Sequence, residues 1–264
     1  MLDPIVLDAC NPGPMTGAGN NTYLLASQGA AALIDAGVGH PDHLAALDRA
    51  LRESDATLRV VAVTHDHADH VSGVRDIAAV HPSATFAKWP GRETSAGLPW
   101  QLLQDGETLE VGDECLTVVY TPGHAPDHLA FWHGPTRALF TGDLVVSGGS
   151  IVIDVTRGGD LRQYLRSLDR VLELEPSRLF PAHGPRVDDP VTLVRAHVAH
   201  RLMRERQVVT ALAEGHRSVE AIAESIYHGL DARLMAAARE NVRAHLQKLS
   251  ADGIAADKDG WRLL

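Results

Sequence analysis

Metal-binding side chains are concentrated in residues 64–70, which read T-H-D-H-A-D-H. Neutral imidazole and carboxylate oxygen both suit zinc and similar divalent cations. In an extended loop the rings of His65 and His67 point to the same side, whereas the next two ligands follow on another turn of the backbone. Four ligands in so short a segment favour two adjacent ions over a polar surface loop that is rich in histidine by chance. The candidate ligands are His65, His67, Asp69 and His70.

The neighbouring sequence places this segment between a strand and a helix. Residues 59–64 (R-V-V-A-V-T) form an apolar run typical of a buried parallel strand. Residues 71–80 carry apolar side chains at helical spacing. Loops at the ends of such strands are where α/β folds usually place their chemistry.

Polar side chains follow three further predicted strands. His124 stands in the run T-P-G-H, Asp143 in T-G-D and His183 in P-A-H-G, each at the end of a predicted strand. We expect these side chains to converge with residues 64–70 on one site, because all of them lie at the corner where a strand finishes.

Hydrophobic periodicity and turn residues divide residues 1–190 into two halves, each β-rich first and helical afterwards. This order fits two mixed sheets packed together with helices outside. Residues 89–101 are expected to form a loop, and His40 and His43 to be solvated rather than ligating. Further strands are expected at 22–25, 31–35, 84–88, 108–111, 115–120, 129–132, 138–140 and 178–181, and helices at 41–53 and 160–174.

Residues 191–264 differ in character from the rest of the chain. Three helices and a terminal hairpin are expected there, with Ser218 as an N-cap, and together they resemble a winged-helix module. We therefore predict two domains, residues 1–190 and residues 191–264. The expected helices are 191–215, 218–227 and 234–251, and the hairpin turns at 259–260.

The composition is that of a globular protein, with 45% hydrophobic and 22% charged residues. The net charge of −10 argues against a protein that coats nucleic acid. No apolar run approaches the roughly 20 residues that span a bilayer, and the first residues lack the basic region of a secretory signal. Cys10 and Cys115 imply no disulfide framework, so we expect a cytoplasmic protein that does not contact membranes.

The ordered motifs H-D-H-A-D-H, P-G-H, T-G-D and P-A-H-G resemble those of the metallo-beta-lactamase-fold hydrolases. The match extends over residues 20–185. The runs at 142–153 and 159–168, together with the helical tail, resemble the beta-lactamase-like protein 2 branch of that family. The resemblance implies an α/β fold, a four-layer αβ/βα sandwich with metals at one edge between the sheets. In that branch a small C-terminal winged-helix-like domain follows.

The resemblance also implies how the ligands divide between two metal ions. Many beta-lactamases use a cysteine ligand at the second ion. Here no cysteine is among the candidate ligands of that ion, which argues against beta-lactam hydrolysis. We expect zinc, although manganese and iron occupy similar sites. By resemblance, His65, His67 and His124 hold the first ion, Asp69, His70 and His183 hold the second, and Asp143 bridges them.

This site predicts a hydrolase whose nucleophile is a hydroxide that bridges the two ions. Two divalent ions, two carboxylates and one hydroxide leave a net charge of about +1, which suits an anionic or ester-type substrate. We count Asp69 and Asp143 as catalytic as well as ligating. His128 is either a general acid for the leaving group or a buried group that hydrogen-bonds near the ligands.

Three functions remain open from the sequence. The branch resemblance suggests a single-strand-specific endoribonuclease, in which the basic residues Arg233, Arg239, Arg243 and Lys248 would contact RNA. However, residues 195–264 hold 11 basic against 9 acidic side chains, which is a small excess. The alternative is an ester, thioester or lactone hydrolase acting on a small molecule, and a non-catalytic metal-dependent binding module is the third.

Overall fold

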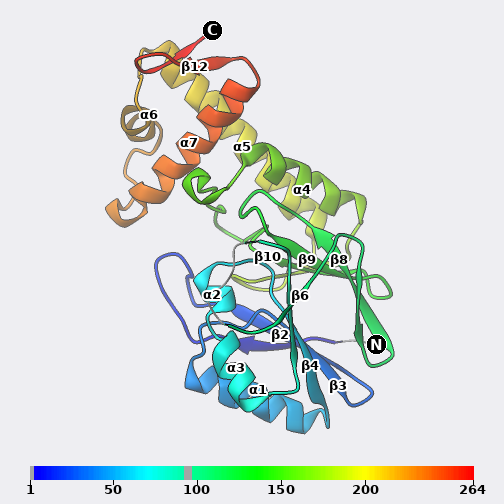
Figure 1. The fold of residues 1–264 in the computed structure, drawn as a ribbon. Helices are drawn as coiled ribbons and strands as arrows, with labels where there is room; N and C mark the ends of the chain where they lie inside the picture. Colours follow the sequence, from blue (N-terminus) through cyan, green and yellow to red (C-terminus); the bar gives the residue numbers. More distant parts are fainter. Residues whose placement is uncertain (1–2, 92–96) are drawn as a thin grey trace.

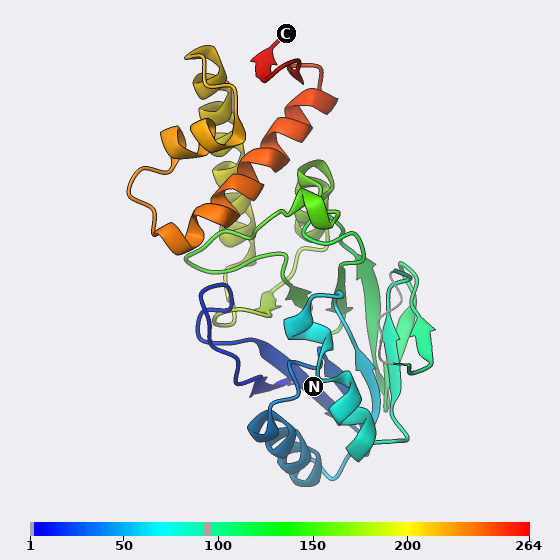
Figure 2. The same ribbon diagram turned by 60° about the vertical axis from the view of Figure 1, so that its left-hand side comes forward.

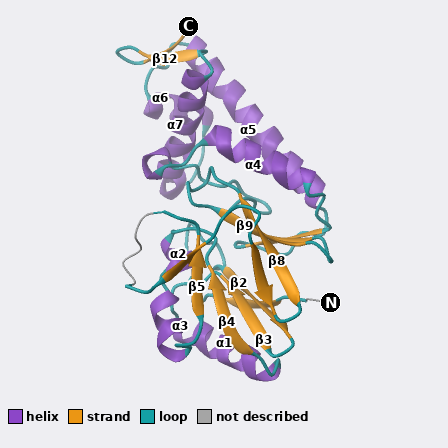
Figure 3. Cartoon of the chain, turned by 45° about the vertical axis from the view of Figure 1, so that its right-hand side comes forward, coloured by secondary structure: helices purple, strands orange, loops and turns teal. Residues whose placement is uncertain are grey.

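Two β-sheets lie face to face between layers of helices in the first two-thirds or so of the chain (Figure 1, Figure 3). The computed structural model describes residues 3–91 and 97–264. The first sheet is mixed: β1 to β3 pair antiparallel, and β3 to β6 pair parallel. Its six strands, in spatial order, are β1 (Ile5–Asp8), β2 (Asn21–Ser27), β3 (Ala30–Ile34), β4 (Thr57–Ala62), β5 (Thr85–Lys88) and β6 (Trp100–Leu102).

The second sheet has five strands in the order β11-β10-β9-β8-β7. Its neighbours pair antiparallel except β10 and β11, which are parallel because α4 (Leu161–Glu173) connects them. The strands are β7 (Thr108–Val111), β8 (Glu114–Tyr120), β9 (Leu129–His133), β10 (Ala138–Gly142) and β11 (Arg178–Pro181).

Alternation along the strands builds a separate apolar layer on each face of each sheet. In β2, Tyr23 and Leu25 pack between the two sheets, whereas Leu24 packs on the opposite side under the helices. Both faces of the sheet are therefore buried away from water. This explains why the sequences of its inner strands are continuous apolar runs. The helices α1 (Pro41–Glu53) and α3 (Val74–Val80) cover the first sheet, and α4 and α5 (Pro190–Ala213) cover the second. This confirms the predicted four-layer arrangement.

The predicted helix at 71–80 is wrong in one respect, because two helices occupy that region. A short helix α2 (Ala68–Val71) has Ser72 as its C-cap, and α3 begins after Gly73. A Cβ on Gly73 would lie 2.1 Å from the Ala36 carbonyl oxygen. The break therefore lets the backbone pack directly against the corner that follows β3.

Two other expectations also need correction. The end of the expected loop 89–101 is in fact β6, an edge strand that pairs parallel with β5; residues 92–96 lie outside the described part. His43 is fully buried rather than solvated, and its Nε2 lies 2.8 Å from the Thr22 hydroxyl. His43 lies in the first turn of α1, and the sequence of that turn does not indicate that its side chain faces the sheet.

The C-terminal part is the predicted module of three helices and a hairpin, standing above the sandwich in Figure 1. Ser218 caps α6 (Val219–Ile226) as expected, accepting a hydrogen bond from the Ala221 amide. The C-terminal module has its own hydrophobic core, which includes Leu212, Ile222 and Val242. Within the described residues no helix has the length and apolar content needed to cross a membrane. The elements after α5 are α6 (Val219–Ile226), α7 (Met235–Ala251), β12 (Ala255–Asp257) and β13 (Trp261–Leu263), with short 3₁₀ turns at Val155–Arg157 and Ala232–Leu234.

A buried arginine ties this module to the sandwich. The Arg201 guanidinium on α5 donates to the Ile151 carbonyl oxygen and to Asn241 Oδ1 on α7. The same Asn241 oxygen accepts from the Ile153 amide at 3.2 Å. The loop around residues 150–154 is therefore held by helices α5 and α7.

We predict that Gly123→Ala destabilises the protein by about 3 kcal/mol, because overpacking against backbone cannot relax cheaply. Gly123 has φ +134°, and a Cβ there would lie 2.2 Å from the Tyr164 amide nitrogen. Gly215→Ala is the matched control: φ is +91° but nothing lies within 4 Å of its Cβ, so we expect only about 1 kcal/mol. Urea unfolding measures both, and equal losses would contradict the contact argument.

Candidate metal centre

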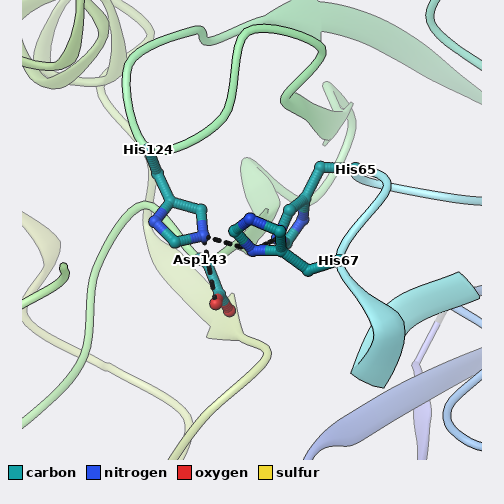
Figure 4. Close-up of side chains that lie close together, drawn as sticks. All are labelled: His65, His67, His124 and Asp143. Carbon is teal, nitrogen blue, oxygen red and sulfur yellow. Dashed lines mark hydrogen bonds and ion pairs between the residues drawn. The ribbon is translucent and has the colours of Figure 1, made fainter. Parts of the chain in front are cut away.

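Three imidazole rings converge on one point beside Asp143 (Figure 4). His67 Nδ1 lies 2.9 Å from His65 Nε2 and 2.9 Å from His124 Nε2. The Asp143 Oδ2 atom is 3.6 Å from His124 Nε2. One ligand atom from each of the four residues thus lies within 4.8 Å of the ligand atoms of the other three.

A second group adjoins the first. It consists of Asp69, His70 and His183, whose ligand atoms also lie within 4.8 Å of one another. Asp143 Oδ1 is 3.5 Å from His70 Nε2 and 3.3 Å from His183 Nε2. The two oxygens of Asp143 therefore face different groups, which is the arrangement a bridging carboxylate needs.

Strand ends supply every member of the two groups. His65, His67, Asp69 and His70 follow β4, as predicted. His124 follows β8, Asp143 follows β10, and His183 follows β11. Because these strands finish at one edge of the paired sheets, side chains up to 118 positions apart meet there. The structure thus brings together all seven residues that the sequence singled out.

Hydrogen bonds fix which ring nitrogens carry protons in the first group. His124 Nδ1 donates to the Val152 carbonyl oxygen at 2.8 Å, so its Nε2 presents a lone pair to the centre. The Thr64 hydroxyl gives its hydrogen to Asp35, which leaves its oxygen to accept from His65 Nδ1 at 3.0 Å. His65 Nε2 is then also an acceptor.

Lone pairs that face each other without a shared hydrogen call for a cation. At most one hydrogen, on His67 Nδ1, is available to the three converging nitrogens. Among the described residues, buried Asp143 Oδ1 has no hydrogen-bond partner. Imidazole nitrogen and carboxylate oxygen form a donor set for zinc, manganese or iron, so the residues fit a divalent metal at each group.

Burial keeps the first group in its metal-binding form. Desolvation lowers the pKa of His65 and of His124, and it lowers the pKa of His67 to about 4, so all three rings are neutral at pH 7. The second group behaves differently. Burial opposes the charged forms of His70 and Asp143. Even so, the carboxylates of Asp35 and Asp143 raise the pKa of His70, and His70 and His183 hold the pKa of Asp143 low. A proton on His70 therefore competes with a cation.

Asp35 was not identified as a site residue from the sequence. The residue is 3% exposed, and its side chain accepts from His70 Nδ1 at 2.8 Å, from the Thr64 amide at 2.7 Å and from the Thr64 hydroxyl. It thereby fixes the tautomer of His70 with Nε2 toward the site. The signal was present, because Asp35 is the last residue of the predicted strand 31–35 and so stands at a strand end, as the ligands do.

Asn20 is a second residue that the sequence analysis missed. Its Nδ2 lies 3.0 Å from Asp69 Oδ2 and 3.2 Å from His70 Nε2, so it holds the side chains of the second group. The sequence around Asn20 and Asn21 indicates only a turn before a strand. It does not indicate that the side-chain amide of Asn20 contacts metal ligands.

His128 has the geometry of the buried alternative. Its Nε2 accepts from the Asp143 amide at 3.1 Å, and its Nδ1 therefore donates to the Thr121 hydroxyl at 2.8 Å. Burial lowers its pKa to about 3. A neutral ring with both nitrogens engaged has no proton to give a leaving group, so this geometry favours positioning of Asp143 over acid catalysis.

Comparison with protein families gives two matches. The model described as the metallo-beta-lactamase superfamily matches residues 15–183. The model described as the beta-lactamase associated winged helix domain matches residues 218–261.

Similar proteins were found both by sequence and by structure. A beta-lactamase-like protein 2 homolog of Caenorhabditis elegans is 32% identical over 252 residues, covering 92% of this chain and 83% of that protein. A thioesterase of Emericella nidulans is 34% identical over 77% of this chain and 57% of its own length. A metallo-beta-lactamase family protein from Thermus thermophilus shares the fold, with a TM-score of 0.80 and 22% identity over 100% of this chain and 98% of that chain.

We predict that Asp35→Asn weakens zinc binding roughly 10- to 100-fold, as is usual when the partner of a ligating histidine is changed. An asparagine amide cannot both accept from His70 Nδ1 and keep the present bonds to Thr64, so the ring loses its fixed tautomer. Competition with a chromophoric chelator measures the affinity. Asp42→Asn, on an exposed carboxylate at the start of α1, is the control. Unchanged zinc affinity in Asp35→Asn would refute this role.

A second prediction concerns the pH dependence of metal-free protein. The pKa of His128 is about 3 in the folded chain against an ordinary value of 6.5. Between these values the unfolded chain binds a proton that the folded chain does not, so the stability contribution is lost as pH falls. The slope is up to about 1.4 kcal/mol per pH unit.

His128→Gln keeps an acceptor for the Asp143 amide but removes this titration. We expect its free energy of unfolding to fall less steeply below pH 6.5 than that of the wild type, as measured by urea unfolding in chelator at several pH values. His228→Gln, on an exposed histidine, serves as the control. Identical slopes in wild type and His128→Gln would show that the ring takes up its proton in the folded state.

Proposed function

The chain belongs to the metallo-beta-lactamase superfamily, and on that premise we propose that it hydrolyses a small ester or thioester with two bound metal ions. The observation that carries the proposal is Asp143, whose two oxygens face two separate groups of imidazole and carboxylate ligands. When bound, the two ions would lower the pKa of a water toward about 7 and stabilise negative charge on the substrate.

The protein's own residues have distinct tasks in this reaction. The neutral rings of His65, His67 and His124 would hold one ion, and Asp69, His70 and His183 the other. Asp143 would join the ions, and its position is fixed by the hydrogen bond from its amide to His128.

Arg157 supplies a positive charge in the wall of the cavity that contains the ligands. Its side chain forms no ion pair with a described residue. In hydrolysis, water oxygen bonds to the acyl carbon and the bond to sulfur or oxygen breaks. The products are a carboxylate and a thiol or alcohol that takes the proton. Arg157 is placed to attract an anionic leaving group.

Charge on the C-terminal module favours a small substrate over RNA. The basic residues that would contact RNA are each paired with carboxylates: Arg233 with Asp231, Arg239 with Glu224, Arg243 with Glu220 and Glu240, and Lys248 with Glu205 and Asp252. Cations that are already neutralised release few counterions from a phosphate backbone, so they add little to nucleic-acid affinity.

The name of one relative supports the same substrate class. The similar protein of Emericella nidulans is called a thioesterase, although this chain spans only 57% of its length. Because a fold alone does not fix a substrate, the substrate class is tested directly with purified protein.

We predict that the purified protein hydrolyses members of an ester and thioester panel. His65→Ala or Asp143→Ala should lower kcat/KM by at least about 1,000-fold, because metal activation of water contributes several kcal/mol. Chelator should abolish turnover, and zinc or manganese should restore it. His228→Ala, on an exposed residue far from the ligands in sequence, is the control.

Labelled single-stranded RNA belongs in the same screen. Metal-dependent RNA cleavage with a steep salt dependence and no thioester turnover would overturn the proposed substrate class while keeping the metal site. Wild-type turnover after complete removal of metal would overturn the mechanism itself.

A further inference from the structure

A large cavity lies where the C-terminal helices meet the loops of the sandwich. Its volume is about 780 Å³, within the range of pockets that hold small organic molecules. Apolar side chains form much of its wall: Met15 from the loop after β1, Leu193 and Ala196 from α5, and Ala237 from α7. In Figure 2 this loop, coloured blue, reaches toward the start of α7, coloured orange.

This cavity adjoins the one that contains the metal ligands. Met15, Val146, Ser150 and Val152 line both, and the second, of about 330 Å³, is also lined by Asp143. Met15 is 60% exposed at this boundary. An exposed, flexible thioether between two cavities is suited to contact an apolar ligand that extends from one into the other.

An arginine without a carboxylate partner lies in the wall of the large cavity. The Arg204 guanidinium stacks 4.4 Å from the ring centroid of Tyr227, and its Nη1 donates to Gln207 Oε1 at 2.9 Å. Its Nε contacts His200 Nε2 at 3.3 Å. Among the described residues, Arg204 forms no ion pair, and its Nη2 group makes no hydrogen bond.

His200 does not compensate for the absent carboxylate. Burial, together with Arg201 and Arg204, lowers the pKa of His200 to about 4, so its ring is neutral at pH 7. Much of the cavity wall is apolar, and its Arg204 guanidinium has no carboxylate partner among the described residues. Such a cavity fits an apolar chain that carries a carboxylate, since arginine binds carboxylates through two parallel hydrogen bonds.

We propose that the large cavity binds the acyl chain of the substrate and that Arg204 binds a carboxylate carried on that chain. The assignment rests on the proposed function, because the cavity leads to the metal ligands. It narrows the substrate class to esters or thioesters of medium-length acyl chains with an anionic end. The winged-helix module then forms one wall of the substrate site.

Filling the cavity tests the apolar part of the proposal. Ala237→Trp should lower the ratio of kcat/KM for decanoyl over acetyl thioester at least 10-fold. Ala236→Trp, on an exposed neighbour in the same helix, should leave the ratio unchanged. Ala196→Phe fills the cavity from α5 and replaces Ala237→Trp if that variant does not fold. An unchanged ratio in a folded cavity variant would overturn the proposal.

Replacing the arginine tests the anionic end. Wild-type protein should prefer a thioester of decanedioic acid, with its free terminal carboxylate, over the decanoyl thioester. In Arg204→Met, the ratio of kcat/KM for the decanedioic thioester over the decanoyl thioester should fall at least 10-fold. In Arg206→Met, on an exposed arginine of α5, this ratio should be unchanged. Equal preference in Arg204→Met and wild type would remove Arg204 from the substrate site.

Binding to metal-free protein separates this proposal from the proposed function. In chelator, isothermal titration calorimetry should show decanedioate binding that Ala237→Trp and Arg204→Met each weaken at least 10-fold. Such binding without turnover of any thioester would support the cavity while overturning the proposed hydrolysis. Turnover without decanedioate binding, or binding that both variants leave unchanged, would overturn the cavity assignment.

Discussion

The structure depends on one constraint: lone pairs from several buried side chains point at a common centre with too few hydrogens among them. His65 and His124 are forced into this state because their other ring nitrogens donate to Thr64 and to the Val152 carbonyl. The other oxygen of Asp143, Oδ1, faces the second group, 3.3 Å from His183 Nε2. Burying acceptors without donors is costly, so bound cations would stabilise such a cluster.

Partners behind the ligands make this constraint rigid. Asp35 and Thr64 orient rings from the sandwich side, and His128 holds the backbone of Asp143. None of these three is among the predicted ligands, yet each is buried and fully hydrogen-bonded in its place. The chemistry of the site thus rests on residues that would not contact a substrate.

The C-terminal module takes part in the same network. Through Arg201 and Asn241, helices α5 and α7 hold the loop that supplies the Val152 carbonyl to His124. The module therefore supports the site from outside and also closes the large cavity beside it. One set of helices therefore connects the orientation of a ligand with the shape of the proposed acyl site.

By itself, the sequence determined the four layers, the winged-helix module and the seven converging side chains. It could do so because strand and helix periodicities are local and because the ligands stand in short ordered motifs at strand ends. Only the tertiary structure decided what touches those ligands. The roles of Asn20 and Asp35, the break at Gly73 and the cavity beside Arg204 depend on contacts between distant segments. Local patterns carry no record of such contacts, so packing alone could reveal them.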